Sequence, residues 1–551
     1  MKAKLIIILA IACLSLHAQK HEVRAVWLTT IGGIDWPRNH SAAAQKRELT
    51  SMLDQLKRAG INTVLFQTRV RASTIYPSSI EPFDICLTGR HGQSPGYDPL
   101  LFAIEECHRR GMECHAWMVT IPIGKTSEAR FKEFKRKNPN LVKTIGQEGF
   151  MNPENPQTGD YLANMCAEVT RRYDIDGIHL DYIRYPETWG KRKEERGERR
   201  ANAQERRANI TSIVRKIHKA VKTLKPWVKL SCSPIGKSGD LTRYRSGGWN
   251  AYNAVYQDPQ GWLREGLMDQ LYPMMYFRGN NFFPFALDWQ ERSYGRTIVP
   301  GLGIYFLSPG EANWPLTDIT REMHFLRQNG IGHCYFRAKF LTDNTKGLYT
   351  FVRDFDNTPA LIPPMTWAWS QAPSAPDRLD VSHSNDRDQI AWGGAVDHSR
   401  ATYLLYNVYA STMPEVDTND PRLLIATRLR ETRLTVPHTA GQTLYYAVTA
   451  IDRYGNESAA KSELQANSTS QAHRATVTRT DGRRLRMPSK PSTLEADYLA
   501  IENMQGQLMT MMPYRGQYAD ISRLPEGMYK MRSVGRKGVT HQLGFFTVKR
   551  K

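Results

Sequence analysis

Short apolar runs alternate with amphipathic stretches through residues 22–357. The runs have the length of strands, and the stretches between them repeat their apolar residues with the period of a helix. This order is typical of a parallel sheet whose strands are joined by helices, so the pattern predicts an α/β fold. The predicted strands are Val23–Leu28, Asn62–Gln67, Glu113–Val119, Asp176–Ile183, Val228–Ser233, Met268–Tyr276, Thr297–Leu302 and Gly332–Phe336. This many strands with helices between them favour a closed (β/α)8 TIM barrel over an open sheet.

Stop signals support the helices between these strands. Gly60 follows the amphipathic stretch 46–59 and Gly111 follows the stretch 99–110, at positions where helices commonly end in glycine. The remaining predicted helices are 155–173, a long basic helix after the fourth strand, 260–266 and one that ends near Gly330.

The pattern changes where this alternation stops. Residues 359–375 are rich in Pro and Ala and are interpreted as a linker. Residues 376–465 alternate apolar and polar positions and carry Trp392 on an early strand, which predicts a small β-sandwich. A polar stretch, 465–474, precedes residues 475–551, whose hairpin-like segments predict a second small all-β domain, a C-terminal β-sandwich.

The N-terminus has the order of a secretory signal peptide. Two lysines precede the apolar run Leu5–Leu16, and the sequence His-Ala-Gln follows it, so a signal peptide is predicted at residues 1–19. Residues 20–358 then form the barrel. The run is too short for a permanent membrane span, and no later stretch of the sequence is long and apolar enough for one. A lipoprotein site at Cys13 is a weaker alternative, because the apolar run before it is short. We therefore expect an exported protein, found in the periplasm, on the outer surface or in the medium.

The chain of 551 residues has a formal charge of +21, which favours anionic partners. No nucleic-acid-binding motif accompanies the charge, so we expect acidic envelope polymers and no nucleic acid as partners. The densest basic run, Lys191–Arg207, mixes Lys, Arg and Glu at helical spacing and is interpreted as a solvated helix face. The cysteines after Cys13 are scattered, which predicts neither a disulfide framework nor a metal site, and no cofactor is indicated. We expect a monomer.

The strongest chemical signal lies in the fourth predicted strand. Side chains alternate faces along a strand, so His179, Asp181 and Ile183 are predicted to share one face, opposite Ile178 and Leu180. A carboxylate at the end of a buried strand is costly to desolvate unless it has partners or a task. In a (β/α)8 barrel the C-terminal strand ends carry the active site, so Asp181 is the first catalytic candidate. A structural Asp–Arg pair that closes a loop is the alternative.

Polar and aromatic side chains gather near the predicted C-terminal strand ends. Taken one at a time, each of these residues is best interpreted as a packed side chain of the core. Together they predict a cleft in which rings stack on the apolar faces of sugars and polar groups bind the hydroxyls. The predicted substrate-binding residues are Trp27, Gln67, Arg69, His115, Trp117, His179, Arg184, Tyr272, Tyr276 and Arg337. The predicted partner is therefore a polysaccharide.

Several motifs occur here in the order that is found in one known family. They are Glu22–Leu28, His115–Trp117, Asn152–Pro156, Asp176–Pro186, Gly266–Asp269 and Tyr272–Tyr276. Through them, residues 22–357 resemble the glycosyl hydrolase-like 10 family, which consists of bacterial envelope proteins with a (β/α)8 barrel. The resemblance implies cleavage of peptidoglycan glycan strands that lack stem peptides.

The two C-terminal segments resemble known modules as well. Residues 376–465, through the motif Leu444–Ser458, resemble a fibronectin type III domain, whose implied role is spacing or weak carbohydrate binding. Residues 475–551, through the Gly-x-Tyr strand at Tyr529 and the basic end, resemble the C-terminal sorting domains of type IX secretion. A second small β-sandwich without a sorting role is the alternative.

Most glycosidases use two carboxylates, and the second must be found near the first. Glu187 follows Asp181 closely in the loop after the strand and is the second catalytic candidate, whereas Asp269 opens its strand and is interpreted as structural. The strand also resembles the Asp-Gly-x-Asp-x-Asp-x-Glu strand of chitinase-type glycosidases, in which the N-acetyl group of the substrate is the nucleophile. Here His179 replaces the middle Asp and Ile183 stands where the acid Glu belongs, so that mechanism does not transfer directly.

These observations predict an exported glycoside hydrolase that acts on an N-acetylhexosamine-containing glycan, with Asp181 and Glu187 as catalytic residues. The alternative is a non-catalytic glycan-binding protein, or an adhesin-like surface protein, that uses the same barrel cleft.

Overall fold

The computed structural model describes residues 19–191, 201–244, 246–384, 386–437 and 443–463, together with shorter segments near the C-terminus. Those segments are 478–480, 484–486, 498–503, 507–514, 518–534 and 540–548. The predicted signal peptide up to residue 18, the polar stretch 465–474 and residues 192–200 of the basic run lie outside the described residues. The chain divides into two compact units, residues 1–463 and 464–551.

A closed barrel of parallel strands forms the larger part of the first unit, which confirms the predicted (β/α)8 fold. In hydrogen-bonded order its strands are β10 (Thr297–Ile298), β9 (Gln270–Leu271), β8 (Lys229–Cys232), β7 (Gly177–Asp181), β3 (Glu113–Val119), β2 (Thr63–Arg69), β1 (Arg24–Leu28), β12 (His333–Tyr335) and β11 (Gly301–Leu302). β10 and β11 are two halves of one strand, so the sheet closes on itself. The gap between them contains Pro300, which has no N–H group to donate to the ladder.

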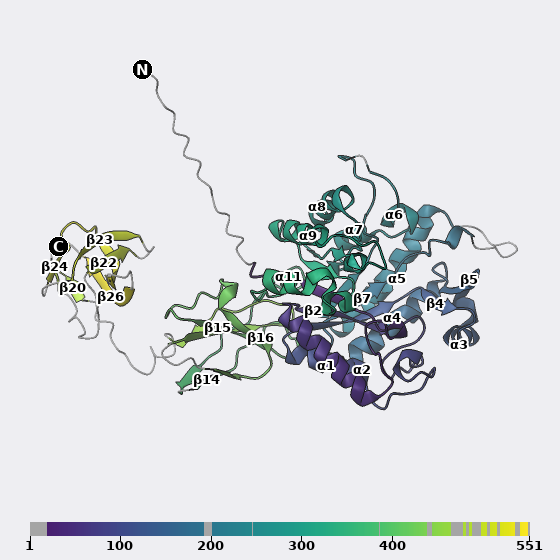
Figure 1. The fold of residues 1–551 in the computed structure, drawn as a ribbon, viewed down its shortest axis with the longest axis horizontal. Coiled ribbons are helices and arrows are strands. Elements are labelled where there is room, and N and C mark those ends of the chain that lie inside the picture. The colour runs from purple at the N-terminus through teal and green to yellow at the C-terminus, as the bar shows by residue number, and fades with distance from the viewer. Residues whose placement is uncertain are drawn as a thin grey trace, which may run out of the picture. The chain divides into compact units, whose positions relative to one another are not determined.

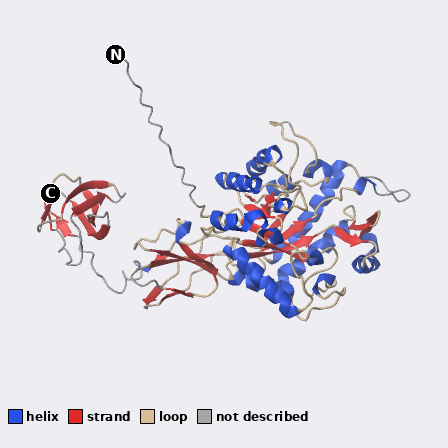
Figure 2. Cartoon of the chain, in the orientation of Figure 1, coloured by secondary structure: helices blue, strands red, loops and turns tan. Residues whose placement is uncertain are grey.

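Helices surround these strands (Figures 1 and 2). The longer ones are α1 (Ala42–Arg58), α2 (Pro99–Arg109), α4 (Pro156–Arg172), α5 (Ala203–Leu224) and α9 (Leu316–Gln328). The shorter ones are α3 (Ala129–Lys137), α6 (Ala251–Ala254), α7 (Pro259–Arg264), α8 (Phe283–Glu291), α10 (Ala338–Thr342) and α11 (Leu348–Phe355). Local sequence sets their starts. The Asp98 carboxylate caps α2 by accepting from the N–H groups of Leu100 and Leu101, and Pro99 takes the first helical position.

One part of the barrel region departs from the regular alternation. After β3 the chain forms a small antiparallel sheet of β4 (Pro122–Lys125), β6 (Glu148–Met151) and β5 (Val142–Ile145), in that order, with α3 inserted before β5. The hydrophobic pattern did not predict this sheet. Each of its strands has only 4 residues, too few for an alternation to stand out from the neighbouring helical stretches.

Two layers of side chains fill the barrel region. Outward-facing strand residues, such as Ile178 and Leu180, pack with the helices in the main core. Inward-facing residues, such as Trp27 and Trp117, form a separate cluster inside the barrel. The alternation along β7 therefore turns Asp181 toward the interior cluster.

Residues 379–463 of the first unit form small antiparallel sheets, as predicted for the region after the barrel. One sheet contains β13 (Leu379–His383), β14 (Arg387–Trp392) and β17 (Arg433–Pro437). The other contains β16 (Leu424–Leu429), β15 (Leu405–Ser411), β18 (Tyr445–Ile451) and β19 (Lys461–Ser462). Trp392 from the first sheet and Tyr406 and Tyr446 from the second belong to one buried cluster.

These sheets contact the N-terminal ends of the barrel strands through buried charges. Arg428 donates to Oε1 of Glu113 at 3.0 Å and to Oδ1 of Asp176 at 2.5 Å. Arg453 donates to Oδ1 of Asp174 at 2.7 Å. Although burial acts in the opposite direction, the charge of Arg428, with those of neighbouring cations, holds the pKa of Asp176 well below its ordinary value. Glu113, Asp174 and Asp176 are therefore all paired with arginines of the β-sheet region.

Residues 359–375, predicted as a linker, contain no helix or strand but pack closely. Leu361 pairs with His21 in an isolated parallel bridge. Met365 is buried in the main core, and the indole Nε1 of Trp367 donates to Oδ1 of Asp269 at 3.0 Å.

The second unit has its own small sheets. One contains β20 (Thr478–Thr480), β26 (Thr540–Val548), β25 (Gly527–Val534), β22 (Tyr498–Asn503) and β23 (Leu508–Pro513), and β21 (Arg484–Arg486) pairs with β24 (Tyr518–Asp520). Except for β20, which runs parallel to β26, the paired strands are antiparallel. Leu499, Ile501 and Phe546 lie in the core of this unit.

Candidate active site

Asp181 is the last residue of β7 and lies at the C-terminal end of the barrel. Its Oδ2 atom accepts a hydrogen bond of 3.2 Å from Nε1 of Trp117. Its Oδ1 atom accepts bonds of 2.8 Å from Oγ of Ser233 and from the N–H group of Tyr182. Because Trp117 belongs to β3 and Ser233 follows β8, the strands on both sides of β7 hold the carboxylate.

The environment of Asp181 changes its acidity. Burial raises the pKa of Asp181 above its ordinary value, against the charge of Arg184 and the hydrogen bonds from Ser233, Tyr182 and Trp117. A carboxyl group with a raised pKa at the end of a barrel strand is a candidate for a catalytic group.

The chain turns directly after Asp181. Tyr182 has a φ of 53°, in the left-handed region, so the alternation of β7 ends there. Ile183, predicted to share the face of Asp181, is instead buried in the main core with the outward-facing residues. That prediction was wrong because it continued the strand past its last residue.

Arg184 lies against the ring of Tyr182, with the guanidinium carbon 4.1 Å from the ring centroid. Its Nη2 atom pairs with Oε1 of Glu187 at 3.2 Å, and the side chains differ in exposure, at 4% for Arg184 and 45% for Glu187. Nε and Nη1 of Arg184 are buried and have no hydrogen-bond partner among the described residues. Arg184 therefore pairs with one of the two predicted catalytic carboxylates, Glu187, and its charge lowers the pKa of the other, Asp181.

Aromatic rings border the same end of the barrel. The rings of Tyr276 and Phe336 stack with centroids 5.2 Å apart, and Tyr305 packs edge-on against both at 5.7 Å. Burial, followed by the charges of Cys334 and Asp181, raises the pKa of Tyr276 well above its ordinary value. The sequence prediction missed Phe336 and Tyr305, although Phe336 stands at the end of the eighth predicted strand and was available as a signal.

Trp27 and His179, both predicted to bind substrate, lie inside the barrel. Nε1 of Trp27 donates to Nε2 of His179 at 3.1 Å, and Nδ1 of His179 lies 3.0 Å from Oγ of Ser231. Because Nε2 accepts, Nδ1 carries the proton and donates to the serine. Burial, reinforced by His115, lowers the pKa of His179 well below its ordinary value, so the ring is neutral. His179 is the inward-facing residue directly before Asp181 on β7. Both of its ring nitrogens already have hydrogen-bond partners within the protein.

Gln67 and Arg69, also predicted to bind substrate, hold loops. Oε1 of Gln67 accepts from the N–H groups of Thr30 at 2.8 Å and Ile31 at 2.7 Å, which fixes the loop after β1. Arg69 is fully buried and pairs with Glu81 at 2.6 Å. Their polar groups are therefore engaged within the protein.

His115 and Tyr272 are fully buried in the interior. Nε2 of His115 lies 2.9 Å from Oε2 of Glu113, toward the N-terminal strand ends. A Cβ atom at residue 177 would lie 2.6 Å from Nδ1 of His115, so Gly177 leaves the room that this imidazole needs. The hydroxyl of Tyr272 donates to Oε1 of Gln270 at 3.0 Å. His115 lies opposite Gly177, whereas Asp181 lies opposite Val119, four residues further along the strands. His115 is therefore well below Asp181 in the barrel.

Arg337 follows the eighth strand position and is half-buried. It pairs with Asp35, whose carboxylate also accepts from the N–H groups of Thr29 and Lys339. Arg337 thereby joins the loop after β1 to the loop after β12. At the opposite end of the barrel, Asp269 pairs with Lys222 at 2.6 Å, a structural position.

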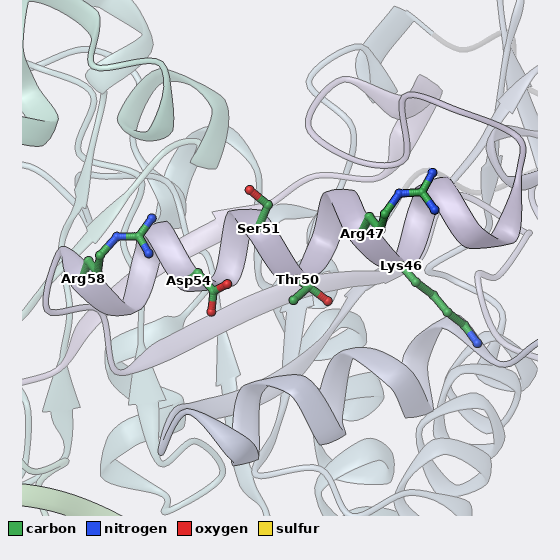
Figure 3. A pocket seen from close by; sticks show the side chains of 6 residues that line it. All are labelled: Lys46, Arg47, Thr50, Ser51, Asp54 and Arg58. Atoms are coloured by element: carbon green, nitrogen blue, oxygen red, sulfur yellow. The ribbon is translucent and has the colours of Figure 1, made fainter. Parts of the chain in front are cut away.

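A hollow of about 480 Å³ lies elsewhere, along the outer face of α1 (Figure 3). Its lining residues are Lys46, Arg47, Thr50, Ser51, Asp54 and Arg58. All of them come from one helix, and Asp54 is already paired with Arg110 at 2.7 Å. The hollow brings no groups from different elements together, so it is not the candidate site.

Among the described residues, no cluster of three or more His, Cys, Asp or Glu side chains is arranged to hold a metal ion. Among the helices within the same residues, none has the length and apolar character needed to cross a membrane.

Comparisons with known proteins add family relationships to this geometry. Residues 22–306 match the sequence model of the glycosyl hydrolase-like 10 family. The chain is 28% identical to glycosyl hydrolase YngK of Bacillus subtilis strain 168 over 480 residues, which cover 80% of this chain and 92% of that relative. It is 31% identical to glycosyl hydrolase DigH of Escherichia coli strain K12 over 287 residues, which cover 46% of this chain and 65% of that relative.

Solved structures include distant neighbours. The glycoside hydrolase domain of PgaB (BpsB) from Bordetella bronchiseptica aligns with 60% of this chain and 98% of its own length, at 13% identity and a TM-score of 0.42.

Proposed function

Because the chain belongs to the glycosyl hydrolase-like 10 family, we propose that it hydrolyses O-glycosidic bonds at the C-terminal end of its barrel, with Asp181 as the essential carboxylate. One observation carries the proposal. Asp181 is a buried carboxyl group, held by donors from Trp117, Ser233 and Tyr182, at the strand end where barrel enzymes place their catalytic groups.

The role of Asp181 follows from its surroundings. Hydrogen bonds from fixed donors keep its orientation without reorganisation, and low exposure strengthens its charge toward a bound sugar. In its ionised form it would balance the positive charge that develops on the sugar ring in the transition state. Its raised pKa means that this ionised form is lost at a higher pH than for an ordinary aspartate.

Glu187 is the proposed second carboxylate. Its side chain is 45% exposed and pairs with Arg184, whose charge also lowers the pKa of Asp181, and it lies in the loop that follows β7. A partly exposed carboxylate can change its rotamer when substrate arrives, which a pair of acids flanking a glycosidic bond requires.

The proposed substrate is an N-acetylhexosamine-containing glycan, namely peptidoglycan strands without stem peptides. The partly buried rings of Tyr276 and Phe336 supply aromatic surface for sugars at this end of the barrel. The formal charge of +21 favours acidic polymers. We also propose export past the inner membrane, with residues 376–465 as a fibronectin type III-like module and residues 475–551 as a sorting domain.

A non-catalytic glycan-binding protein is the second candidate. Ile183, which stands where chitinase-type enzymes have their acid glutamate, is fully buried in the main core, so no acid can act from that position. This absence favours binding without hydrolysis over a chitinase-type mechanism.

Incubation of the purified protein with peptide-free and with intact peptidoglycan separates the two candidates. Soluble fragments detected by mass spectrometry, absent with Asp181→Asn, support the hydrolase. Retention on the insoluble polymer with no fragments from any glycan supports the binding protein and overturns the hydrolase.

A further inference from the structure

Arg184 carries hydrogen-bond donors that the described residues leave unused. Its side chain is 4% exposed, and neither Nε nor Nη1 has a partner among those residues. A buried donor without an acceptor costs about 1–3 kcal/mol, and more for a charged group. Such a group is retained in native proteins where a ligand, an ion or water completes it.

We propose that Arg184 binds a free carboxylate on the sugar next to the scissile bond, and that Glu187 holds this position while the site is empty. This inference rests on the proposed glycosidase function. It identifies the feature of the glycan that the site recognises.

The geometry around Arg184 suits a carboxylate. Its guanidinium carbon lies 4.1 Å from the centroid of the Tyr182 ring, a contact that does not use the N–H groups of the guanidinium. A planar guanidinium matches the two oxygens of a carboxylate. The protein already places one carboxylate there, because Oε1 of Glu187 lies 3.2 Å from Nη2.

Glu187 is the partner that can leave. The contact is a single one, and 45% of the Glu187 side chain is exposed, so solvent compensates this carboxylate when it moves. Arg184, by contrast, stays buried. When Glu187 moves away it frees Nη2 of Arg184, and the acid of the substrate takes its place while Glu187 becomes available for the reaction.

The acid that Arg184 binds must belong to a sugar at Asp181. Tyr182 directly follows Asp181, donates its N–H group to Oδ1 of Asp181, and packs its ring against the interior cluster. The guanidinium of Arg184 lies against the same ring. A carboxylate on Arg184 would therefore lie on the same side of Tyr182 as the proposed catalytic site.

Two kinds of amino-sugar polymer carry such a carboxylate. One contains muramic acid, whose lactyl carboxylate is free once the stem peptide is removed. The other alternates N-acetylhexosamine with a uronic acid. A stem peptide converts the lactyl carboxylate into a neutral amide and adds bulk, so Arg184 would discriminate against strands that keep their peptides.

The decisive measurement compares one strand in two chemical states. Peptide-free peptidoglycan strands are assayed as they are and after carbodiimide coupling of their carboxylates to methylamine. A polymer of alternating N-acetylglucosamine and glucuronic acid, and chitin oligosaccharides, are assayed beside them. Loss of one charge-assisted bond predicts kcat/KM about 10- to 100-fold lower on the amidated strands. Cleavage of the uronic acid polymer in preference to the muramic acid strands would assign the carboxylate to that source.

Arg184→Gln should remove the discrimination, with a lower rate on the free acid strands and little further loss on the amidated ones. Arg278→Gln is the matched control, because it removes the same charge from an exposed arginine that pairs with Asp318. The control should keep the 10- to 100-fold preference.

Binding distinguishes a failure of this inference from a failure of the proposed function. Calorimetry with Asp181→Asn and a muramic acid disaccharide, against its methylamide, reports recognition without hydrolysis. Weaker binding of the methylamide supports the carboxylate site even if no glycan is cleaved. Equal binding of the two, or equal cleavage of free and amidated strands, overturns it.

Discussion

The hydroxyl of Ser233 donates a hydrogen bond of 2.8 Å to Oδ1 of Asp181, across two strands in which Leu180 lies opposite Cys232. Trp117 donates to the other oxygen from the strand on the far side. The carboxylate is thus fixed by the register of three parallel strands. This arrangement makes its chemistry testable one donor at a time.

Asp181→Asn should abolish hydrolysis while the protein remains folded. The substitution keeps the shape of the side chain but removes the charge, and we expect kcat to fall by at least about 1,000-fold. The midpoint of thermal unfolding should change by only a few degrees. Activity within a few-fold of the original protein would make Asp181 a structural residue.

Ser233→Ala should shift the pH dependence of kcat/KM. The Ser233 hydrogen bond lowers the pKa of Asp181, so its removal raises that pKa further. If the ionised form is active, the acidic limb of the profile moves to higher pH. Ser231→Ala is the control, since Ser231 contacts His179 and should leave the limb in place. If the acidic limb of Ser233→Ala does not move, the group that titrates in the profile is not Asp181.

Glu187→Gln should lower kcat by about 100-fold, the lower range for loss of an acid–base group. Because this side chain is 45% exposed, stability should stay the same. Removal of its charge also weakens its hold on Arg184, so KM for strands with free carboxylates should fall rather than rise. An unaltered kcat would show that Glu187 takes no part in the reaction.

Arg428→Ala should destabilise the first unit strongly. It removes a partner that lies 2.5 Å from Asp176 and 3.0 Å from Glu113, and loss of one member of a buried pair costs about 3–5 kcal/mol. Because Asp176 keeps His108 and Glu113 keeps Lys229, we expect the lower end of this range. Arg430→Ala is the control, because this side chain is 53% exposed and lies 3.4 Å from Asp174, a contact worth about 0–1 kcal/mol. Urea unfolding measures both, and equal effects would contradict the prediction.

The same contact sets a pH dependence of stability. The pKa of Asp176 is well below its ordinary value in the folded protein, so its contribution is present above the pKa of the unfolded chain, about 3.9. The contribution is lost as pH falls through the lower, folded value. The Arg428→Ala protein should therefore be less stable than the original protein at neutral pH. On acidification its free energy of unfolding should fall by a smaller amount than that of the original protein. Parallel acid unfolding curves would argue against this role of Asp176.

Truncation after Gln465 tests the proposed sorting role of the C-terminal residues. Cells that produce the full chain should show the protein at the surface or in the medium, and cells that produce the truncated chain should retain it in the periplasm. The same periplasmic distribution of both proteins would reject the sorting role.

Local patterns predicted much of this protein. Alternation and spacing identified the eight barrel strands, and Asp181 stood out because a lone carboxylate at a strand end is costly without partners. The same local reasoning missed the β4–β6 sheet and carried Ile183 onto the wrong face, since it could not detect the turn at Tyr182.

The tertiary structure decided which polar residues meet. His179 and Asp181 share a face of one strand, yet His179 is closed off by Trp27 and Ser231 while Asp181 lies at the end. Arg428 and Asp176 are 252 residues apart, and no spacing rule joins them. The direction of a side chain along a strand is a local property of the backbone, so the sequence determines it. Register, barrel closure and the pairing of buried charges depend on the free energy of the whole packed chain, so only the tertiary structure decides them.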